Sequence, residues 1–206
     1  HLLDWTKKGD RPARIVNYNS GAGCNLSGCV SVSSFTKIFS PGVRCGWIEA
    51  EDHIIQTVSS SVGYIRSQGG TSPVIGSVLA LGLANKTVDR VLQRYCDLYK
   101  HRCELLCQII EQEPRIQIVL QPTGGYFLWI RFPETMGGST QFLSYCTEKG
   151  VSFLLGTRCD ACDTSDQASA SFLGNYGRLC FVEMDERRLK DAAELLVESF
   201  HMFIDG

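Results

Sequence analysis

The stretch that decides how this chain folds is SSFTKIFSPGVRCGW, residues 33–47. It ends a β-branched run that starts at residue 29, and its Pro41-Gly42 pair is a turn signal ahead of a second strand signal over residues 43–48. The segment therefore predicts two strands joined by a turn. Lys37 follows the first strand, and the turn can fold Arg44, seven positions later, back toward it.

These residue types suit a ligand that carries both an anionic group and a carbonyl. An arginine offers a planar fork of donors to a phosphate, and serine hydroxyls offer further donors. A lysine amine is a nucleophile toward a carbonyl carbon. On spacing alone, a hairpin that simply exposes Lys37 and Arg44 explains the segment equally well.

The remainder of the chain alternates helices with strands, which predicts an α/β or α+β fold. Apolar residues recur at helical spacing in some segments and alternate or run together in others. Expected helices start at Glu51, Ser72, Thr87, Gln141 and Asp185, and expected strands cover residues 116–120, 126–132, 151–155 and 177–182. Ser72 before Pro73, and Asp185, are predicted N-caps, and Gly150 is a predicted helix end. Tyr126, Phe127 and Trp129 are expected to be core residues rather than a specificity pocket.

Composition excludes several classes of protein. The 206 residues carry a formal net charge of −2 and no block of basic residues, so we expect no nucleic-acid partner. The longest apolar runs fall far short of the roughly 20 residues of a membrane-spanning helix. We therefore expect no membrane partner.

Ten cysteines are many for a chain of this length. Most lie within expected helices and strands, unlike those of a small secreted scaffold held by disulfides. The best metal-binding candidate is the pair Cys159 and Cys162, with Cys24 and Cys29 as conceivable partners. A zinc site generally needs a second close pair, so we expect reduced thiols and no metal.

Three segments of this chain resemble one enzyme family. Residues 33–47 resemble the Schiff-base motif of class I/II (fold type I) pyridoxal-phosphate-dependent aminotransferases, Ser-Phe-Ser-Lys running into Pro-Gly-x-Arg-x-Gly-Trp. Thr36 stands where the motif usually has serine. Residues 122–129, PTGGYFLW, are similar to the family's Pro-x-Gly-Gly-x-Phe-x-Trp turn and strand. Residues 175–181, NYGRLCF, resemble its strand with a substrate-binding arginine.

The resemblance implies a role for each matching residue. Lys37 would form the Schiff base with pyridoxal 5′-phosphate, and Ser34 and Arg44 would bind the cofactor's phosphate. Arg178 would bind the α-carboxylate of the substrate. The implied activity moves an amino group from an L-amino acid to a 2-oxo acid, in amino acid metabolism. A homodimer in the cytoplasm is implied, with a mitochondrial location left open.

The same resemblance implies that the chain is the carboxy-terminal part of an α/β fold. Residues 1–86 would be a partial cofactor-binding large domain, and residues 87–206 a small α+β domain. Family residues that contact the cofactor ring would lie before His1, since Asp4 is too late to serve as the ring-nitrogen aspartate. We therefore expect the amino-terminal half of such an enzyme to be absent, and this chain alone to be inactive. A sheet edge and an apolar face would be exposed.

Several alternatives stay open. The turn at residues 69–72 could reach a neighbouring subunit's cofactor or simply cap a helix. The reaction could instead be that of a β-lyase, a decarboxylase or a ring-forming synthase of the same fold. The chain could also be the aminotransferase-like domain of a transcription regulator that senses pyridoxal phosphate. Aromatic, kynurenine-like and 2-aminoadipate-like substrates are not distinguished.

Overall fold

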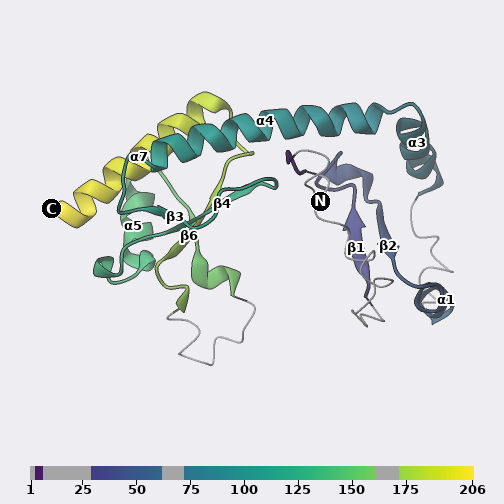
Figure 1. The fold of residues 1–206 in the computed structure, drawn as a ribbon, viewed down its shortest axis with the longest axis horizontal. Coiled ribbons are helices and arrows are strands. Elements are labelled where there is room, and N and C mark those ends of the chain that lie inside the picture. Colours follow the sequence, from purple (N-terminus) through teal and green to yellow (C-terminus); the bar gives the residue numbers. More distant parts are fainter. Residues whose placement is uncertain (1–2, 7–28, 62–71, 161–171) are drawn as a thin grey trace. The chain divides into compact units, whose positions relative to one another are not determined.

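The computed structural model describes residues 3–6, 29–61, 72–160 and 172–206. These residues form two compact units, His1–Cys96 and Asp97–Gly206, and Figure 1 shows their elements. The long helix α4 (Thr87–Ile110) contains the boundary between the units, whereas the sequence places a domain boundary at residue 86, just before this helix. That domain assignment stays a prediction.

In its described residues, the first unit contains a two-stranded antiparallel sheet and several helices. Strand β1 (Ser31–Ser34) pairs with β2 (Gly46–Glu49) in a register that sets Ser34 opposite Gly46. Between the strands lies the short 3-10 helix η2 (Pro41–Val43), and α1 (Asp52–Ser61) and α3 (Pro73–Ala84) follow. Ser72 occupies the predicted N-cap position of α3, but its side chain makes no capping hydrogen bond.

Much apolar surface of this unit is exposed. Val32 on β1 is 73% exposed, and α3 has no charged residue, yet Val74 on it is 71% exposed. A helix that is apolar on all sides is normally buried against other protein. The exposure expected from the sequence is therefore present in the described residues, and what covers it stays a prediction.

The second unit contains a four-stranded antiparallel sheet in the order β3-β4-β6-β5. Its strands are β3 (Gln117–Ile118), β4 (Phe127–Arg131), β5 (Leu154–Leu155) and β6 (Tyr176–Cys180). Besides the second part of α4, its described residues form η3 (Glu134–Met136), α5 (Ser139–Lys149), η4 (Gly156–Cys159) and α7 (Glu186–Asp205). The mixed helix and sheet content agrees with the predicted α/β class.

Helix ends in this unit follow the predicted local chemistry. Asp185 caps α7 by accepting a hydrogen bond from the backbone N–H of Arg188 at 2.9 Å. Gly150 ends α5 in the left-handed backbone conformation, with a φ of 97°. Strand β5 is shorter than predicted: the Val151 N–H still donates to the Cys146 carbonyl at the end of α5, at 3.0 Å, and only Leu154 and Leu155 pair with β6.

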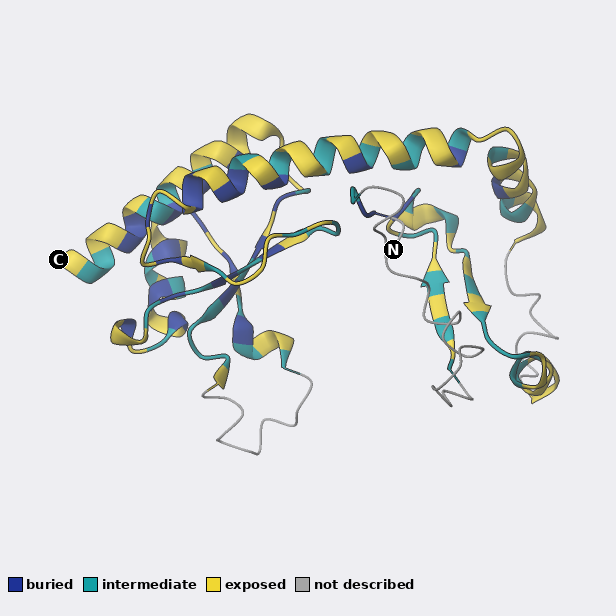
Figure 2. Ribbon diagram, viewed as in Figure 1, coloured by how far each residue is buried: buried dark blue, intermediate teal, exposed yellow. Residues whose placement is uncertain are grey.

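An aromatic cluster forms the core of the second unit, and Figure 2 shows the buried residues where the helices meet the sheet. Phe132 lies 5.2 Å from Phe142 and 5.3 Å from Phe153, measured between ring centroids. Gly177 on β6 is needed beside these rings, because a Cβ there would lie 2.9 Å from a ring carbon of Phe153. The aromatic cluster can therefore pack against β6 only because position 177 has no side chain.

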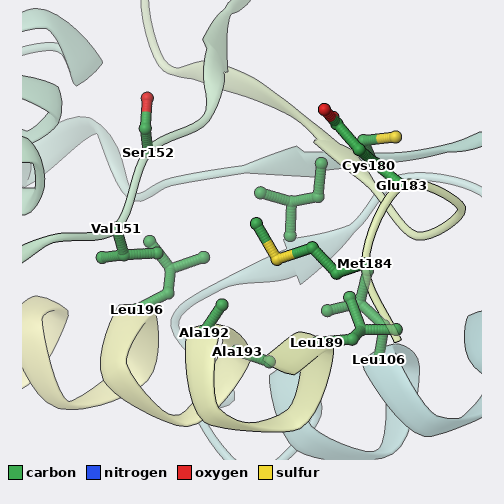
Figure 3. Close-up of a pocket in the computed structure, with 11 residues that line it drawn as sticks. Leu106, Val151, Ser152, Cys180, Glu183, Met184, Leu189, Ala192, Ala193 and Leu196 are labelled. Carbon is green, nitrogen blue, oxygen red and sulfur yellow. The ribbon is translucent and has the colours of Figure 1, made fainter. Parts of the chain in front are cut away.

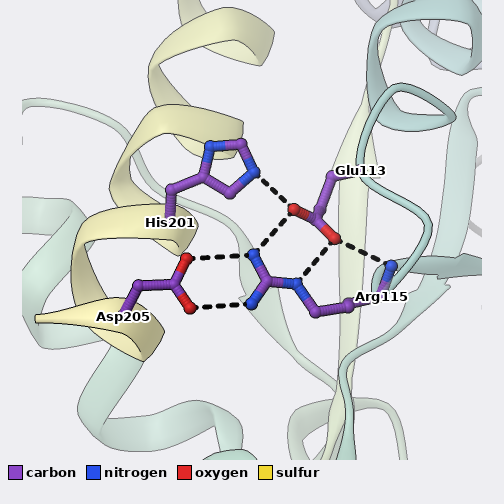
Figure 4. A network of polar contacts seen from close by, with 4 residues as sticks. All are labelled: Glu113, Arg115, His201 and Asp205. Carbon is purple, nitrogen blue, oxygen red and sulfur yellow. Dashed lines mark hydrogen bonds and ion pairs between the residues drawn. The ribbon is translucent and has the colours of Figure 1, made fainter.

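A polar cluster joins the end of α7 to the segment after α4 (Figure 4). The carboxylate of Glu113, only 3% exposed, accepts hydrogen bonds from Arg115 Nε at 2.9 Å and Nη2 at 3.0 Å. The same guanidinium donates to both carboxylate oxygens of Asp205, and His201 Nε2 contacts Glu113 Oε2. The hydrogen bonds from Arg115 lower the pKa of Glu113 from 4.5 to about 2, against the opposing effect of burial.

Replacing Glu113 by Gln should lower the free energy of unfolding at pH 7 by roughly 1–3 kcal/mol, because a buried charged acceptor is lost. The folded-state pKa of Glu113 lies below the unfolded value, so its contribution is complete above about pH 4.5 and disappears as the pH falls toward 2. Urea unfolding of both forms across this range should therefore show the difference shrinking at low pH. Glu194→Gln is the control, since its pair with Lys190 lies on the surface. A constant difference across the range would contradict the assignment.

The described cysteines are all free thiols, and burial raises the pKa of the Cys146 thiol to about 12. Within the described ranges, no group of three or more His, Cys, Asp or Glu side chains could hold a metal ion. None of the helices described combines the length and apolar composition needed to cross a membrane.

Candidate active-site residues

The connection between β1 and β2 carries three of the residues singled out by the sequence. Ser34 is the last residue of β1, Lys37 lies in the turn that follows, and Arg44 lies just before β2. The backbone N–H of Phe35 donates to the carbonyl of Cys45 at 2.9 Å, which extends the strand pairing by one step. This closure holds residues 36–44 as a single loop at one end of the hairpin.

Two local features shape this loop. The carbonyl of Phe35 accepts hydrogen bonds from the N–H groups of Phe39 and Ser40, at 2.9 Å and 3.1 Å, so the chain makes one helical turn. Ile38 is buried and anchors the turn, whereas the neighbouring Lys37 is exposed.

Arg44 has a left-handed backbone, with φ 46° and ψ 40°. This conformation costs a residue with a side chain on the order of 1 kcal/mol, and such residues are concentrated at ligand-binding sites. Within the described residues, the Arg44 side chain makes no ion pair, and Ser34 Oγ accepts only a 3.3 Å hydrogen bond from the Thr36 N–H. Both groups are exposed and able to bind an anion.

Gly46 sets the approach of β2 to β1. A Cβ at this position would lie 2.7 Å from the carbonyl oxygen of Ser33 and 3.4 Å from the Cβ of Ser34. Next to it, the rings of Phe35 and Trp47 pack with centroids 5.1 Å apart. The glycine and the aromatic pair together hold the end of the hairpin on which the loop is built.

Gly46→Ala should therefore push β2 away from β1 and destabilise the hairpin by roughly 1–3 kcal/mol, the usual cost of overpacking. Hydrogen exchange of the Phe35 amide, which donates across the hairpin, is the measurement. Gly42→Ala is the matched control, because its Cβ would meet only Ser40 Oγ, at 3.8 Å. Equal exchange rates in the two variants would contradict the packing argument.

Arg178, the fourth residue singled out, lies on β6 in the second unit. Its guanidinium carbon lies 3.9 Å from the centroid of the Phe127 ring. No carboxylate within the described part of the chain pairs with Arg178. A half-buried arginine that contacts a ring but no acid can accept a carboxylate from outside.

The aromatic residues of β4 correct one expectation. Leu128 and Ile130 are fully buried, whereas Phe127 is 41% exposed and Trp129 is half-buried. The prediction that Tyr126, Phe127 and Trp129 belong to the core was wrong, because none of them is buried and the aliphatic residues of the alternating strand take the core face. Trp129 instead stacks on Tyr176 with ring centroids 5.7 Å apart, on the same face of the sheet as Arg178.

This aromatic face was missed by sequence reasoning. The sequence already contained the relevant pattern, because side chains at alternate strand positions lie on the same face of a sheet. Leu128 and Ile130 share one face, and Phe127, Trp129 and Arg131 share the other. Choosing the aliphatic set as the core would have placed the aromatic residues beside Arg178.

A cavity of about 140 Å³ lies elsewhere in the second unit and contains none of the residues singled out (Figure 3). Its walls are mainly apolar and come from α4, α7, the carboxyl end of β6 and the segments at 151–152 and 183–184, with Met184 across from Val151 and Leu196. Leu179, which lines it, points to the opposite face of β6 from Arg178, and Arg178 itself is not among the lining residues.

Three further features were singled out in the sequence: the cysteine pair with its conceivable partners, the turn at residues 69–72, and Asp4. Cys159 is exposed, and Cys24, Cys162 and the turn at residues 69–71 lie outside the described residues. Asp4 is buried and accepts hydrogen bonds from the backbone N–H and the hydroxyl of Thr6.

Comparison with known proteins decides the family. The model of the family "Aminotransferase class I and II" matches residues 13–196, which include all four residues discussed above. The chain belongs to this family. Aminotransferases of this family depend on pyridoxal phosphate.

Curated relatives of this aminotransferase-family chain are considerably longer. It is 26% identical over 172 residues to aromatic-amino-acid aminotransferase 1 of Thermococcus litoralis, covering 82% of the chain and 38% of that protein. It is 24% identical over 132 residues to the 2-aminoadipate transaminase of Thermus thermophilus, covering 63% of the chain and 32% of that protein. The HTH-type transcriptional regulator NorG of Staphylococcus aureus is 30% identical over 110 residues, 52% of the chain and 24% of NorG. The chain thus spans well under half of each relative's length.

Solved structures show the same fold. LysN, the alpha-aminoadipate aminotransferase of Thermus thermophilus, matches with a TM-score of 0.74 and 17% identity, over 99% of this chain and 49% of LysN. The multiple substrate aminotransferase of Thermococcus profundus matches with a TM-score of 0.69 and 21% identity, over 85% of this chain and 41% of that one. Such coverage agrees with a carboxy-terminal portion of the aminotransferase fold.

The residues of the β1–β2 loop fit a phosphorylated aldehyde. Lys37 offers an exposed amine, Ser34 a hydroxyl, and Arg44 a guanidinium that no described carboxylate neutralises. LysN was solved with N-(5′-phosphopyridoxyl)-L-leucine bound, a molecule that carries the cofactor's phosphate. The donor set in this loop is therefore chemically suited to the cofactor of the family.

Proposed function

We propose that this chain supplies the carboxy-terminal part of a pyridoxal-phosphate-dependent aminotransferase, which moves an amino group from an L-amino acid to a 2-oxo acid. The observation that carries the proposal is the loop between β1 and β2, which presents Ser34, Lys37 and Arg44 from one closed segment. The match of the family model over this segment supports it.

Each residue has a defined task in the proposal. Arg44 binds the phosphate of the cofactor through its planar fork of donors, and the Ser34 hydroxyl adds a hydrogen bond. The Lys37 amine holds the cofactor between turnovers. When bound, the cofactor supplies an electron sink for the substrate's α-carbon.

Lys37 and Arg178 then act on the substrate. Arg178 binds the α-carboxylate of the substrate. Its guanidinium is available for this because no acidic side chain among the described residues pairs with it. Lys37 removes the proton at the α-carbon and returns a proton during amino transfer, as a general base and acid. The names of the relatives suggest aromatic amino acids and 2-aminoadipate as substrates to test first.

Lys37 is tested by trapping. The chain is incubated with pyridoxal 5′-phosphate, reduced with borohydride and mapped by peptide mass spectrometry. The adduct should lie on the peptide that contains Lys37 and disappear in Lys37→Ala. Arg44→Ala should require roughly ten- to hundredfold more cofactor for equal labelling, because a charge-assisted hydrogen bond to the phosphate is worth about 1.5–3 kcal/mol.

The matched control for trapping is Lys149→Ala, which removes a lysine at the end of α5. This variant should be labelled at Lys37 like the unmodified chain. Labelling spread evenly over all lysines, or unchanged in Lys37→Ala, would refute the assignment of Lys37.

The relationship to NorG favours a second candidate function, in which a domain of this family binds the cofactor within a transcription regulator. In that case Lys37 is trapped as above, but the polypeptide to which the chain belongs transfers no amino group. An assay of keto-acid-dependent amino transfer separates the two candidates, and also separates amino transfer from a lyase or decarboxylase reaction.

We also propose that the chain associates with a second copy of itself, as the family implies. The exposed apolar helix α3 offers a surface for this contact, with Val78 and Leu81 both more than half exposed. Analytical ultracentrifugation should show a dimer, and Leu81→Glu should shift the mass toward the monomer. Glu198→Gln on α7 is the control, since it leaves α3 unchanged. A mass that is monomeric before substitution would overturn this part of the proposal.

A further inference from the structure

We propose that Phe127 is a positioning residue for Arg178, and that its ring holds the guanidinium ready for the substrate's carboxylate. This inference rests on the proposed function, which assigns the carboxylate to Arg178. It adds a residue whose role the sequence did not indicate, and its experiment is designed so that the two can fail separately.

The sheet register brings the two side chains together. Phe127 is paired with Cys180, and Trp129 with Arg178, so Phe127 and Arg178 are diagonal neighbours on adjacent strands. Both lie on the face opposite to the buried Leu128 and Leu179. Diagonal pairs of this kind are within reach of aromatic and long side chains.

The contact is a face contact with the ring. The guanidinium carbon lies 3.9 Å from the centroid of Phe127, within the range of a cation–π interaction. A cation–π contact requires no hydrogen bond from the guanidinium, so its N–H donors are left to bind a carboxylate with two hydrogen bonds. The ring therefore fixes the arginine without using the donors that bind the substrate.

Phe127 is itself supported from α4. Its ring lies edge-on to Tyr126 with centroids 6.1 Å apart, and Tyr126 lies edge-on to Tyr99 of α4 at 5.8 Å. Trp129, directly opposite Arg178, stacks on Tyr176 instead. Among the described residues, Phe127 alone makes a ring contact with Arg178.

The expected effect is preorganisation. An arginine side chain has much rotamer freedom, which is lost when it binds a carboxylate in one geometry. In this proposal the contact with Phe127 is present both before and after binding. The arginine is therefore already ordered in the free protein, and binding costs less conformational entropy. Without the ring, binding of a carboxylate should weaken roughly two- to tenfold, the effect expected for immobilising one such side chain.

The experiment follows Arg178 directly by NMR. The chain is labelled with ¹⁵N, and the Nε–H resonance of Arg178 is titrated with pyruvate, with sodium chloride as a control for ionic strength. The free chain should show an upfield ring-current shift of this resonance, which Phe127→Leu removes. Phe127→Leu should also raise the dissociation constant for pyruvate roughly two- to tenfold.

Matched variants make the result specific. Phe127→Tyr and Phe127→Trp keep a ring and should retain both the shift and the affinity, which also guards against misfolding of the leucine variant. Phe172→Leu removes an exposed ring that stacks on Tyr176 and should change neither. Arg178→Lys should remove most of the binding.

The outcomes separate the two claims. If Arg178→Lys weakens binding but Phe127→Leu does not, the positioning role of Phe127 is overturned and the proposed carboxylate site stands. If Arg178→Lys leaves pyruvate binding unchanged, the assignment of the carboxylate to Arg178 fails, and the inference fails with it. Loss of affinity in Phe127→Leu that Phe127→Tyr restores supports the inference.

Discussion

The antiparallel pairing of β4 with β6 is the interaction on which the chemistry of the second unit depends. Because side chains alternate along a strand, one register decides both faces of the sheet at once. On one face it sets Leu128 beside Leu179 in the core, and on the other it sets Phe127 within reach of Arg178. A shift of the register by one residue would bury the arginine and expose the core.

In the first unit, the β1–β2 hairpin carries the candidate cofactor-binding residues Ser34, Lys37 and Arg44. One hydrogen bond, from the Phe35 N–H to the Cys45 carbonyl, closes the loop that contains Lys37 and Arg44. Gly46 permits this closure because β2 approaches β1 too closely for a side chain at that position. The loop's chemical groups are exposed, while Ile38 supplies its small packed anchor.

The two units differ in how much of their apolar surface is buried. The second has an aromatic core and a polar cluster that joins α7 to the segment after α4. The first exposes apolar side chains on β1 and α3. The chain spans well under half the length of its curated relatives. The difference agrees with a second unit whose core is built mainly from its own residues, and with a first unit whose apolar surface packs against protein outside this chain.

The sequence by itself determined the family, the candidate residues Lys37, Ser34, Arg44 and Arg178, and most helices and strands. These follow from local chemistry, such as the turn at Pro41-Gly42, the cap at Asp185 and the spacing of apolar residues. The tertiary structure alone decided which parity of β4 forms the core. Aromatic and aliphatic residues are both apolar, so only the packing against α4, α5 and α7 distinguishes them, and it left Phe127 beside Arg178.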